Sequence, residues 1–263
     1  MTISSLLRRI RAGNEALYAT GWANAAIFAA GALLLLLDSR EVMGVNAWLK
    51  PMKFALSITL YAWTAALVLP YLRLKLRLQA LLGGAISLLM MAEISLILLQ
   101  AGRGVRSHFN FATEFDAGVF GLMGLLIGLN TVLVLFICLR LLAQPPALER
   151  PLWHALQAAW LIFFLASGVG GMMISQGGHA IGVPDGGPGL PLLNWSTAGG
   201  DLRAAHFWGL HSIQLLPLAA LGLQRKVRDG RVLVWGTYGL IALYAAVFAA
   251  LLGLARQGVP VWG

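Results

Sequence analysis

The sequence predicts an all-α membrane protein, a bundle of about seven transmembrane helices with the amino terminus inside and the carboxy terminus outside. Of its 263 residues, 59% are hydrophobic and only 11% are charged, whereas an ordinary soluble domain is about 25% charged. Several windows of about 20 residues carry almost no charge, and this is the length that a helix needs to cross a bilayer. Basic residues cluster between these windows, as is typical of membrane proteins. We therefore expect residues 1–263 to form a single transmembrane domain.

The apolar windows define the expected spans in chain order. They are residues 17–37, 53–72, 79–100, 117–139, 153–175, 204–224 and 232–255. The segment before the first span is similar to the positive region of a signal peptide. The apolar run continues to Leu37, however, with no small-residue cleavage site before Asp38. We therefore expect a first helix that is retained.

The net charge of +9 is explained by topology rather than by a nucleic-acid partner. With the amino terminus inside, the inner segments hold twelve of the 19 Lys and Arg residues. An excess of cations in short inner loops orients membrane helices. We expect an integral protein of a bacterial inner membrane, with the lipid bilayer as partner and no nucleic acid.

The longest outer connection, residues 176–203, differs in composition from the short basic inner ones. It contains eight Gly and three Pro, which exclude a continuous helix or a regular strand. Loops of this length are usually lids or binding loops. Because the loop also contains Trp195 and three Leu residues, we expect it to pack onto the bundle as a cover.

Two of the deepest ionisable residues in the outer half of the expected spans are candidate catalytic residues. Glu93 lies about seven residues from the outer end of the third span, hence about 10–12 Å deep. If Asp201 caps the sixth span, His211 lies about 15 Å along the same axis. An isolated carboxylate at that depth takes up a proton or finds a partner. We expect Glu93 and His211 to meet at equal depth, as a working pair or as a pair that only fixes helix packing.

Imidazole and carboxylate groups near the outer face also form a candidate cofactor site. His206 and His211 are five residues apart, hence about 140° apart around a regular helix, so one shared site requires an irregular helix or a ligand from elsewhere. With His108 they could hold haem, and with His108 and Glu93 they could hold a divalent transition metal.

Several cations lie in the expected outer segments, although membrane proteins concentrate Lys and Arg in their inner loops. These outer cations need a separate explanation. The candidate substrate-binding residues are Arg203, Arg106 and Lys53, together with Asp201. One interpretation is that the cations extend towards lipid phosphates. The other is that they hold an anionic small molecule at the outer mouth, with Arg203 as a clamp or as the partner of Asp201.

Two classes of function follow from these residues. The first is a haem or metal protein that performs redox or metal-assisted chemistry on a membrane-soluble substrate, an oxidoreductase among them. A long outer loop followed by an early His in the next span resembles haem A synthase, although that family's repeated His pairs are missing here. The second class is a proton-coupled transporter of a small anion, or a non-catalytic assembly or receptor protein. Transport has less support from the sequence, because the inner half has few polar groups and no broken helix is expected.

Overall fold

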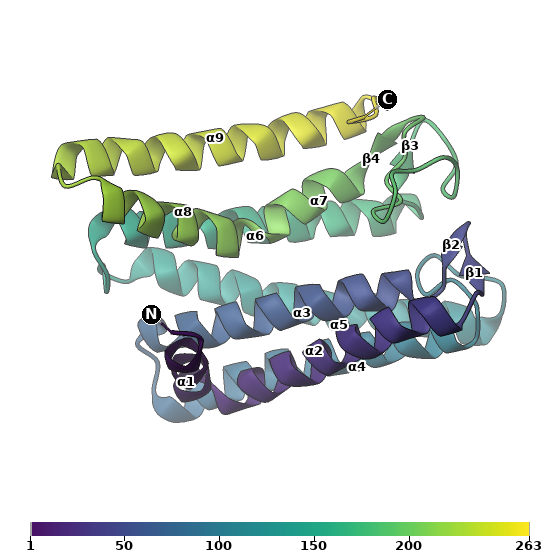
Figure 1. The fold of residues 1–263 in the computed structure, drawn as a ribbon, viewed down its shortest axis with the longest axis horizontal. Helices are drawn as coiled ribbons and strands as arrows, with labels where there is room; N and C mark the ends of the chain where they lie inside the picture. Colours follow the sequence, from purple (N-terminus) through teal and green to yellow (C-terminus); the bar gives the residue numbers. More distant parts are fainter. Residues whose placement is uncertain (1, 263) are drawn as a thin grey trace. The chain divides into compact units, whose positions relative to one another are not determined.

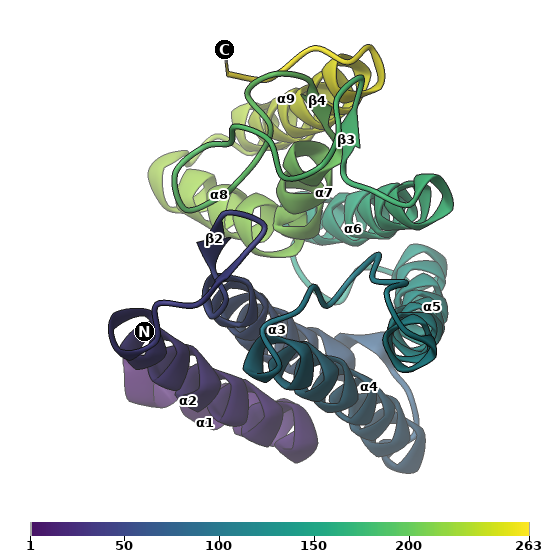
Figure 2. The same ribbon diagram turned by 90° about the vertical axis from the view of Figure 1, so that its right-hand side faces the viewer.

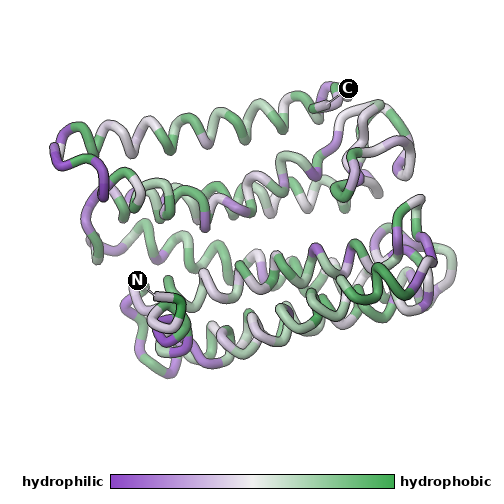
Figure 3. Tube along the Cα trace, in the orientation of Figure 1, coloured by the Kyte–Doolittle hydropathy of each residue, from purple (hydrophilic) through white to green (hydrophobic). Residues whose placement is uncertain are grey.

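The computed structural model describes residues 2–262 and confirms an all-α membrane protein (Figure 1). Among these residues, six helices are long and apolar enough to cross a bilayer. Hydrophilic residues lie mostly at the ends of the helices (Figure 3). The chain divides into two compact units, unit 1 ending at Leu133 and unit 2 beginning at Val134, and each is described by itself. That both form one transmembrane domain stays a prediction.

Unit 1 is built on three helices, each of which packs against the other two. They are α2 (Glu15–Leu37), α3 (Leu49–Val68) and α4 (Leu76–Gly102), and α3 continues into the 3-10 turn η1 (Leu69–Leu72). Between α2 and α3 lies an antiparallel ribbon of β1 (Glu41–Val42) and β2 (Val45–Asn46). Helices α2 and α3 approach closely at Gly21, where a Cβ would lie 1.9 Å from Nε1 of Trp63.

A short helix that the sequence reading missed precedes the first span. Helix α1 (Ile3–Gly13) is separated from α2 by Asn14. The side chain of Asn14 accepts a hydrogen bond from the Leu17 amide at 3.0 Å, which is how an N-cap residue satisfies a free amide at a helix start. The first span therefore begins at Glu15, with an amphipathic helix before it.

Helix α5 (Glu114–Ala143) begins in unit 1 and ends in unit 2. In unit 1, the hydroxyl of Tyr61 on α3 donates a hydrogen bond to Asn130 of α5 at 3.1 Å. In unit 2, the amide of Gln157 on α6 donates to the Leu141 carbonyl at 2.8 Å. Each half of α5 is thus tied to the unit in which it lies.

Unit 2 contains a long first helix that packs against the three helices that follow it. The elements are α6 (Arg150–Gln176), β3 (Ala180–Ile181), β4 (Gly200–Asp201), α7 (Leu202–Leu210), α8 (Ser212–Lys226) and α9 (Gly230–Arg256). Strands β3 and β4 pair antiparallel, so the loop predicted to lack regular strands begins and ends in a short ribbon. Helices α6 and α7 cross closely at Gly209, where a Cβ would lie 2.4 Å from Cβ of Ala166.

The expected sixth span is not one continuous helix, and the prediction that no helix is broken was wrong. The chain leaves helical geometry at His211, between α7 and α8. Pro217 lies inside α8, and a proline has no amide to donate and clashes with the carbonyl four residues earlier. At the break, the hydroxyl of Ser212 donates to the carbonyls of Gly209 and Ala159, both at 2.7 Å. Helices α7 and α8 together return the chain from the end of α6 to the start of α9.

Candidate functional site

Glu93 is a buried acid in the middle part of α4. It lies on α4, its residue is only 1% exposed, and neither carboxylate oxygen has a hydrogen-bond partner among residues 2–262. It is nine residues from the end of α4 at Gly102, or about 13 Å along the helix. Burying a carboxylate without hydrogen-bond partners is costly, so an ionisable residue within a membrane segment is a candidate functional residue.

The imidazole beside Glu93 within unit 1 belongs to His108. Its Nε2 lies 3.9 Å from Oε1 of Glu93, which is too long for a direct hydrogen bond. The other ring nitrogen, Nδ1, lies 3.1 Å from the Ser107 hydroxyl. The rings of Phe54, Phe109 and Phe120 surround the imidazole, with centroids 5.7, 6.1 and 6.1 Å away. His108 therefore lies in an aromatic setting over the buried acid.

The expected pairing of Glu93 with His211 joins two units, because His211 belongs to unit 2. It stays a prediction. The sequence reading gave His108 only the role of an outer ligand, and nothing in the local sequence shows that the connection after α4 folds back over Glu93. The spacing of 15 residues between Glu93 and His108 has no helical periodicity to signal the contact.

Cations gather at the ribbon end of unit 1, which is the end formed by β1, β2 and residues 103–113. Lys50 lies in the first turn of α3, and its charge acts on the Glu93 carboxylate. Its Nζ lies 5.8 Å from the centroid of Phe54, the ring that also contacts His108. Lys53 follows on α3 and is half-buried, and Arg106 is exposed in the 103–113 connection. Two of the predicted anion-binding residues thus lie at the same end as Glu93 and His108.

A carboxylate that the sequence reading missed holds the connection carrying His108. Asp116 accepts hydrogen bonds from Gln100 at 2.9 Å, from Arg103 at 2.5 Å and from the Thr113 hydroxyl at 2.7 Å. The Asp116 amide in turn donates to the Thr113 hydroxyl at 3.1 Å. This reciprocal pair resembles a capping box, so the stretch from Thr113 to Asp116 carried a signal that could have been read. These bonds link the end of α4 to the start of α5.

The two histidines of α7 and its end lie in unit 2. His206 Nδ1 is 2.7 Å from the Ala166 carbonyl, and a Cβ at Gly170 would lie 3.1 Å from its ring. His211 lies at the helix break, with the Phe207 ring at 4.4 Å. The irregular helix required for a shared His206–His211 site is therefore present.

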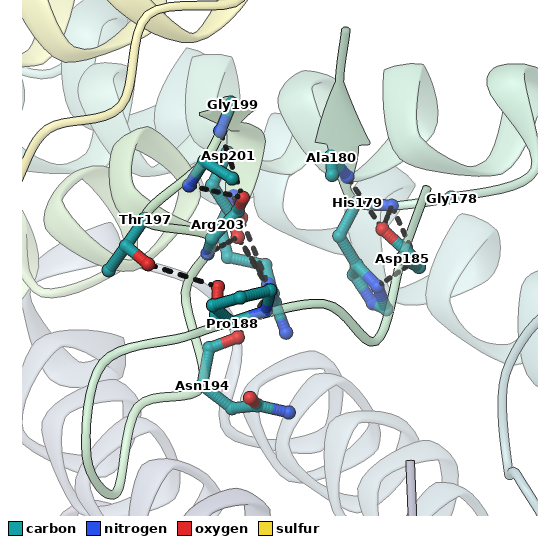
Figure 4. A network of polar contacts seen from close by, with 12 residues as sticks. Gly178, His179, Ala180, Asp185, Pro188, Asn194, Thr197, Gly199, Asp201 and Arg203 are labelled. Carbon is teal, nitrogen blue, oxygen red and sulfur yellow. Dashed lines mark hydrogen bonds and ion pairs between the residues drawn. The ribbon is translucent and has the colours of Figure 1, made fainter. Parts of the chain in front are cut away.

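Asp201 caps α7, as predicted. Its carboxylate, 2% exposed as a side chain, accepts from the Arg203 amide at 2.9 Å and forms an ion pair with the Arg203 guanidinium at 2.5 Å (Figure 4). Arg203 also donates to the Asn194 carbonyl at 2.5 Å. Of the two roles predicted for Arg203, the structure therefore shows the partner of Asp201, which ties the long loop to the start of α7.

The long loop contains a second ion pair, which the sequence reading did not identify. Asp185 accepts from the amides of His179 and Ala180 and lies 2.7 Å from Nδ1 of His179 (Figure 4). Burial acts to raise the pKa of Asp185, but the hydrogen bonds from His179 outweigh it and hold this pKa below its usual range. The turn between Gly178 and Asp185 is thereby closed.

The long loop packs onto unit 2, as expected of a cover. Trp195 lies 5.6 Å from the Phe207 ring and stacks on Trp262 at 6.2 Å. In the view of Figure 2, the loop passes in front of α7. Its packing onto α7 and onto the residues after α9 is therefore established, and a cover over the whole bundle stays a prediction.

The predicted metal and haem ligands are divided between the units, with Glu93 and His108 in unit 1 and His206 and His211 in unit 2. Within the described part of the chain, no group of three or more His, Cys, Asp or Glu side chains could hold a metal ion. A haem or metal site made from these residues stays a prediction. The fold and the site thus define an integral membrane helix protein with a buried carboxylate beside an imidazole. Comparisons with protein-family models, curated proteins and solved structures find no match to this chain.

Proposed function

We propose that this protein is a proton-coupled transporter of a small anion. The observation that supports this most is the state of Glu93: a fully buried carboxylate without hydrogen-bond partners, 3.9 Å from the His108 imidazole. In membrane proteins, such groups typically belong to proton relays or ion pathways.

His108 provides the route by which Glu93 exchanges its proton. Glu93 is 1% exposed, whereas the side chain of His108 is 19% exposed. An imidazole can accept a proton on one nitrogen and release one from the other near neutral pH. One water molecule or a small movement of the ring is enough to bridge 3.9 Å.

Lys50 couples the proton to the anion. While Glu93 is ionised, the charge of Lys50 is balanced by the carboxylate on which it acts. A proton on Glu93 removes that negative charge, and Lys50 together with Lys53 and Arg106 then leaves an excess of positive charge at the ribbon end. This excess attracts an anion, because opposite charges interact strongly where water is partly excluded. Proton and anion therefore bind together.

The broken helix of unit 2 also favours transport. Transporters often contain discontinuous helices, and these irregular backbone segments line their binding sites. The break at His211 divides one pass into two segments joined at a single residue. Such a joint allows α7 to move without unfolding α8.

A second candidate function is a metal-assisted enzyme acting on a membrane-soluble substrate. The spacing of 3.9 Å between Glu93 and His108 suits two ligands of one ion, since metal–ligand distances are about 2.0–2.2 Å. The charge of Lys50 opposes a cation at this place, and for this reason transport comes first. Elemental analysis tests the metal, and the absorption spectrum of the purified protein tests haem.

The test uses purified protein in liposomes that contain a pH-sensitive dye. Small carboxylates and inorganic phosphate are added outside as probes, under an inward proton gradient. We expect proton uptake that depends on one of these anions, with a loss of about 100-fold in Glu93→Gln and a smaller loss in His108→Gln. Glu114→Gln, an exposed acid at the start of α5, is the control and should transport normally.

Two results would overturn the transport proposal. One is wild-type protein that moves no protons with any anion of the panel. The other is Glu93→Gln protein that transports as well as wild-type protein. Stoichiometric metal that is lost in both Glu93→Gln and His108→Gln would support the second candidate instead.

A further inference from the structure

Helix α1 has two chemically distinct faces. At 100° per residue, Ile3, Leu6, Leu7 and Ile10 share one face, Arg8 and Arg9 lie on the opposite side, and Arg11 lies at the border between the two. All three arginines are exposed. Such a helix is typical of segments that lie in the membrane interface with the apolar face down.

Helix α1 lies across the helices of unit 1 and is seen end-on where α2, α3 and α4 run lengthwise (Figure 1). At Gly13 it contacts α3 so closely that a Cβ would lie 2.0 Å from the Ala66 carbonyl. Gln79 of α4 donates to the Gly13 carbonyl at 3.1 Å. These contacts fix the helix across the spans (Figure 1), in the orientation of an interfacial helix.

The apolar face of α1 is only partly covered by protein. Ile10 is buried against the bundle, but Ile3, on the same face, is 79% exposed. Leu76, at the start of α4 beside this end, is 83% exposed. In an integral membrane protein, acyl chains cover such surfaces.

The same end of unit 1 is strongly basic, and we define it as the basic end. Its six exposed cations are Arg8, Arg9, Arg11, Arg73, Lys75 and Arg77. Within residues 2–37 and 69–82 the only acid is Glu15, which pairs with Arg11 at 2.9 Å. The basic end therefore has a large excess of positive charge next to exposed apolar side chains.

We propose that the basic end of unit 1 binds the headgroups of anionic phospholipids. The guanidinium groups of α1 hold the phosphates, since Arg recognises phosphate with paired hydrogen bonds. Ile3 and Leu76 contact the acyl chains below. A cluster of cations on an amphipathic helix is the arrangement that recognises anionic lipid surfaces.

Native mass spectrometry of the detergent-purified protein tests this, with phosphatidylglycerol and phosphatidylcholine as probes. We expect wild-type protein to retain phosphatidylglycerol in preference. The triple variant Arg8→Gln, Arg9→Gln, Arg11→Gln should lose that retention about tenfold or more. The matched control, Arg225→Gln, Lys226→Gln, Arg228→Gln, removes three cations before α9, where no amphipathic helix lies, and should retain the lipid.

Three outcomes would overturn the proposal. Equal losses in the two triple variants would show a general attraction between charges rather than a site. Complete displacement of the lipid by millimolar inorganic phosphate would show a site for the free anion. A variant Ile3→Ser, which keeps every charge, should weaken retention of the lipid, and unchanged retention would exclude the role of the apolar face. Thermal unfolding of each variant verifies that the protein is folded.

Discussion

Units 1 and 2 repeat one order of elements: a long helix, a two-stranded ribbon, a second helix and a third helix. The order is α2, β1–β2, α3, α4 in unit 1 and α6, β3–β4, α7–α8, α9 in unit 2. The second helices also begin alike, with Leu49, Lys50, Lys53 and Phe54 matched in type and spacing by Leu202, Arg203, His206 and Phe207. This similarity is too short to stand out in the sequence, but it becomes visible once both stretches are placed at the start of a second helix.

The two units differ where function is expected. In unit 1 the third helix carries the buried Glu93, whereas residues 232–255 of α9 contain no charged residue. In unit 2 the second helix breaks at His211, whereas α3 is continuous. Unit 1 thus holds the buried carboxylate without hydrogen-bond partners, and unit 2 holds the irregular backbone of the α7–α8 break. Under the transport proposal, proton binding belongs to unit 1 and the conformational change belongs to unit 2.

The largest expected difference between the units concerns the aspartates beside their ribbons. Asp201→Ala removes the N-cap of α7 and the ion pair with Arg203, whose side chain is 26% exposed, and the loss of a cap together with charge-assisted hydrogen bonds costs about 2–4 kcal/mol. Asp38→Ala in unit 1 removes hydrogen bonds from Arg40 and Trp48. Hydrogen bonds from the side chains of Arg40 and Trp48 hold the pKa of Asp38 below its usual range. The Asp38–Arg40 pair is more exposed than the Asp201–Arg203 pair, so we expect a smaller loss of stability in Asp38→Ala. Chemical unfolding in detergent measures both, and equal losses would contradict the comparison.

The next effect concerns the close crossing in unit 2. In Gly209→Ala the new Cβ would lie 2.4 Å from the Ala166 Cβ and 2.8 Å from the Phe248 ring. Overpacking of this kind costs about 1–3 kcal/mol. Gly239→Ala on α9 is the control, since within residues 2–262 a Cβ there meets no atom within 4 Å apart from the neighbouring backbone of its own helix, and it should be neutral or slightly stabilising. The melting temperatures of both variants measure these effects. A larger decrease in Gly239→Ala than in Gly209→Ala would contradict the close crossing of α6 and α7 as the cause.

A substitution at Pro217 tests the break itself. Pro217→Ala restores an amide donor within α8, and we expect a gain of about 1 kcal/mol in stability. The substitution should also make α7 and α8 more continuous, as α3 is in unit 1. Hydrogen exchange at residues 211–215 should slow, and transport in liposomes should decrease. Unchanged exchange would mean that Pro217 does not cause the break.

The smallest expected effect is pH-dependent and lies in the long loop. The pKa of Asp185 is held below its usual range mainly by its hydrogen bonds with His179, against the effect of burial. A lowered pKa in the folded state means that the carboxylate stabilises the loop above the usual aspartate range and loses this contribution as pH falls through and below it. We expect about 1 kcal/mol or less. The stability difference between wild-type protein and Asp185→Asn should be present at pH 7 and shrink below pH 4, and a constant difference would contradict the assignment.

Much of the fold and part of the site could be predicted from sequence, because both rest on local signals. Hydropathy and length located the six long apolar helices to within a few residues, and the capping role of Asp201 depends only on the residues that follow it. The depth of Glu93 followed from its place in one helix. The break at His211 was missed because one proline in an apolar run does not show whether a helix bends or breaks.

By itself the sequence determined that this protein is built from membrane helices, where they lie, and that Glu93 is buried among apolar residues. Only the tertiary structure decided which groups meet, such as His108 with Glu93, Asp116 with Gln100 and Arg103, and His179 with Asp185. The physical reason is that hydropathy and capping act between neighbours in the chain. Contacts between side chains depend instead on how each helix is rotated and on the path of each connection, which only the packing of the whole unit determines.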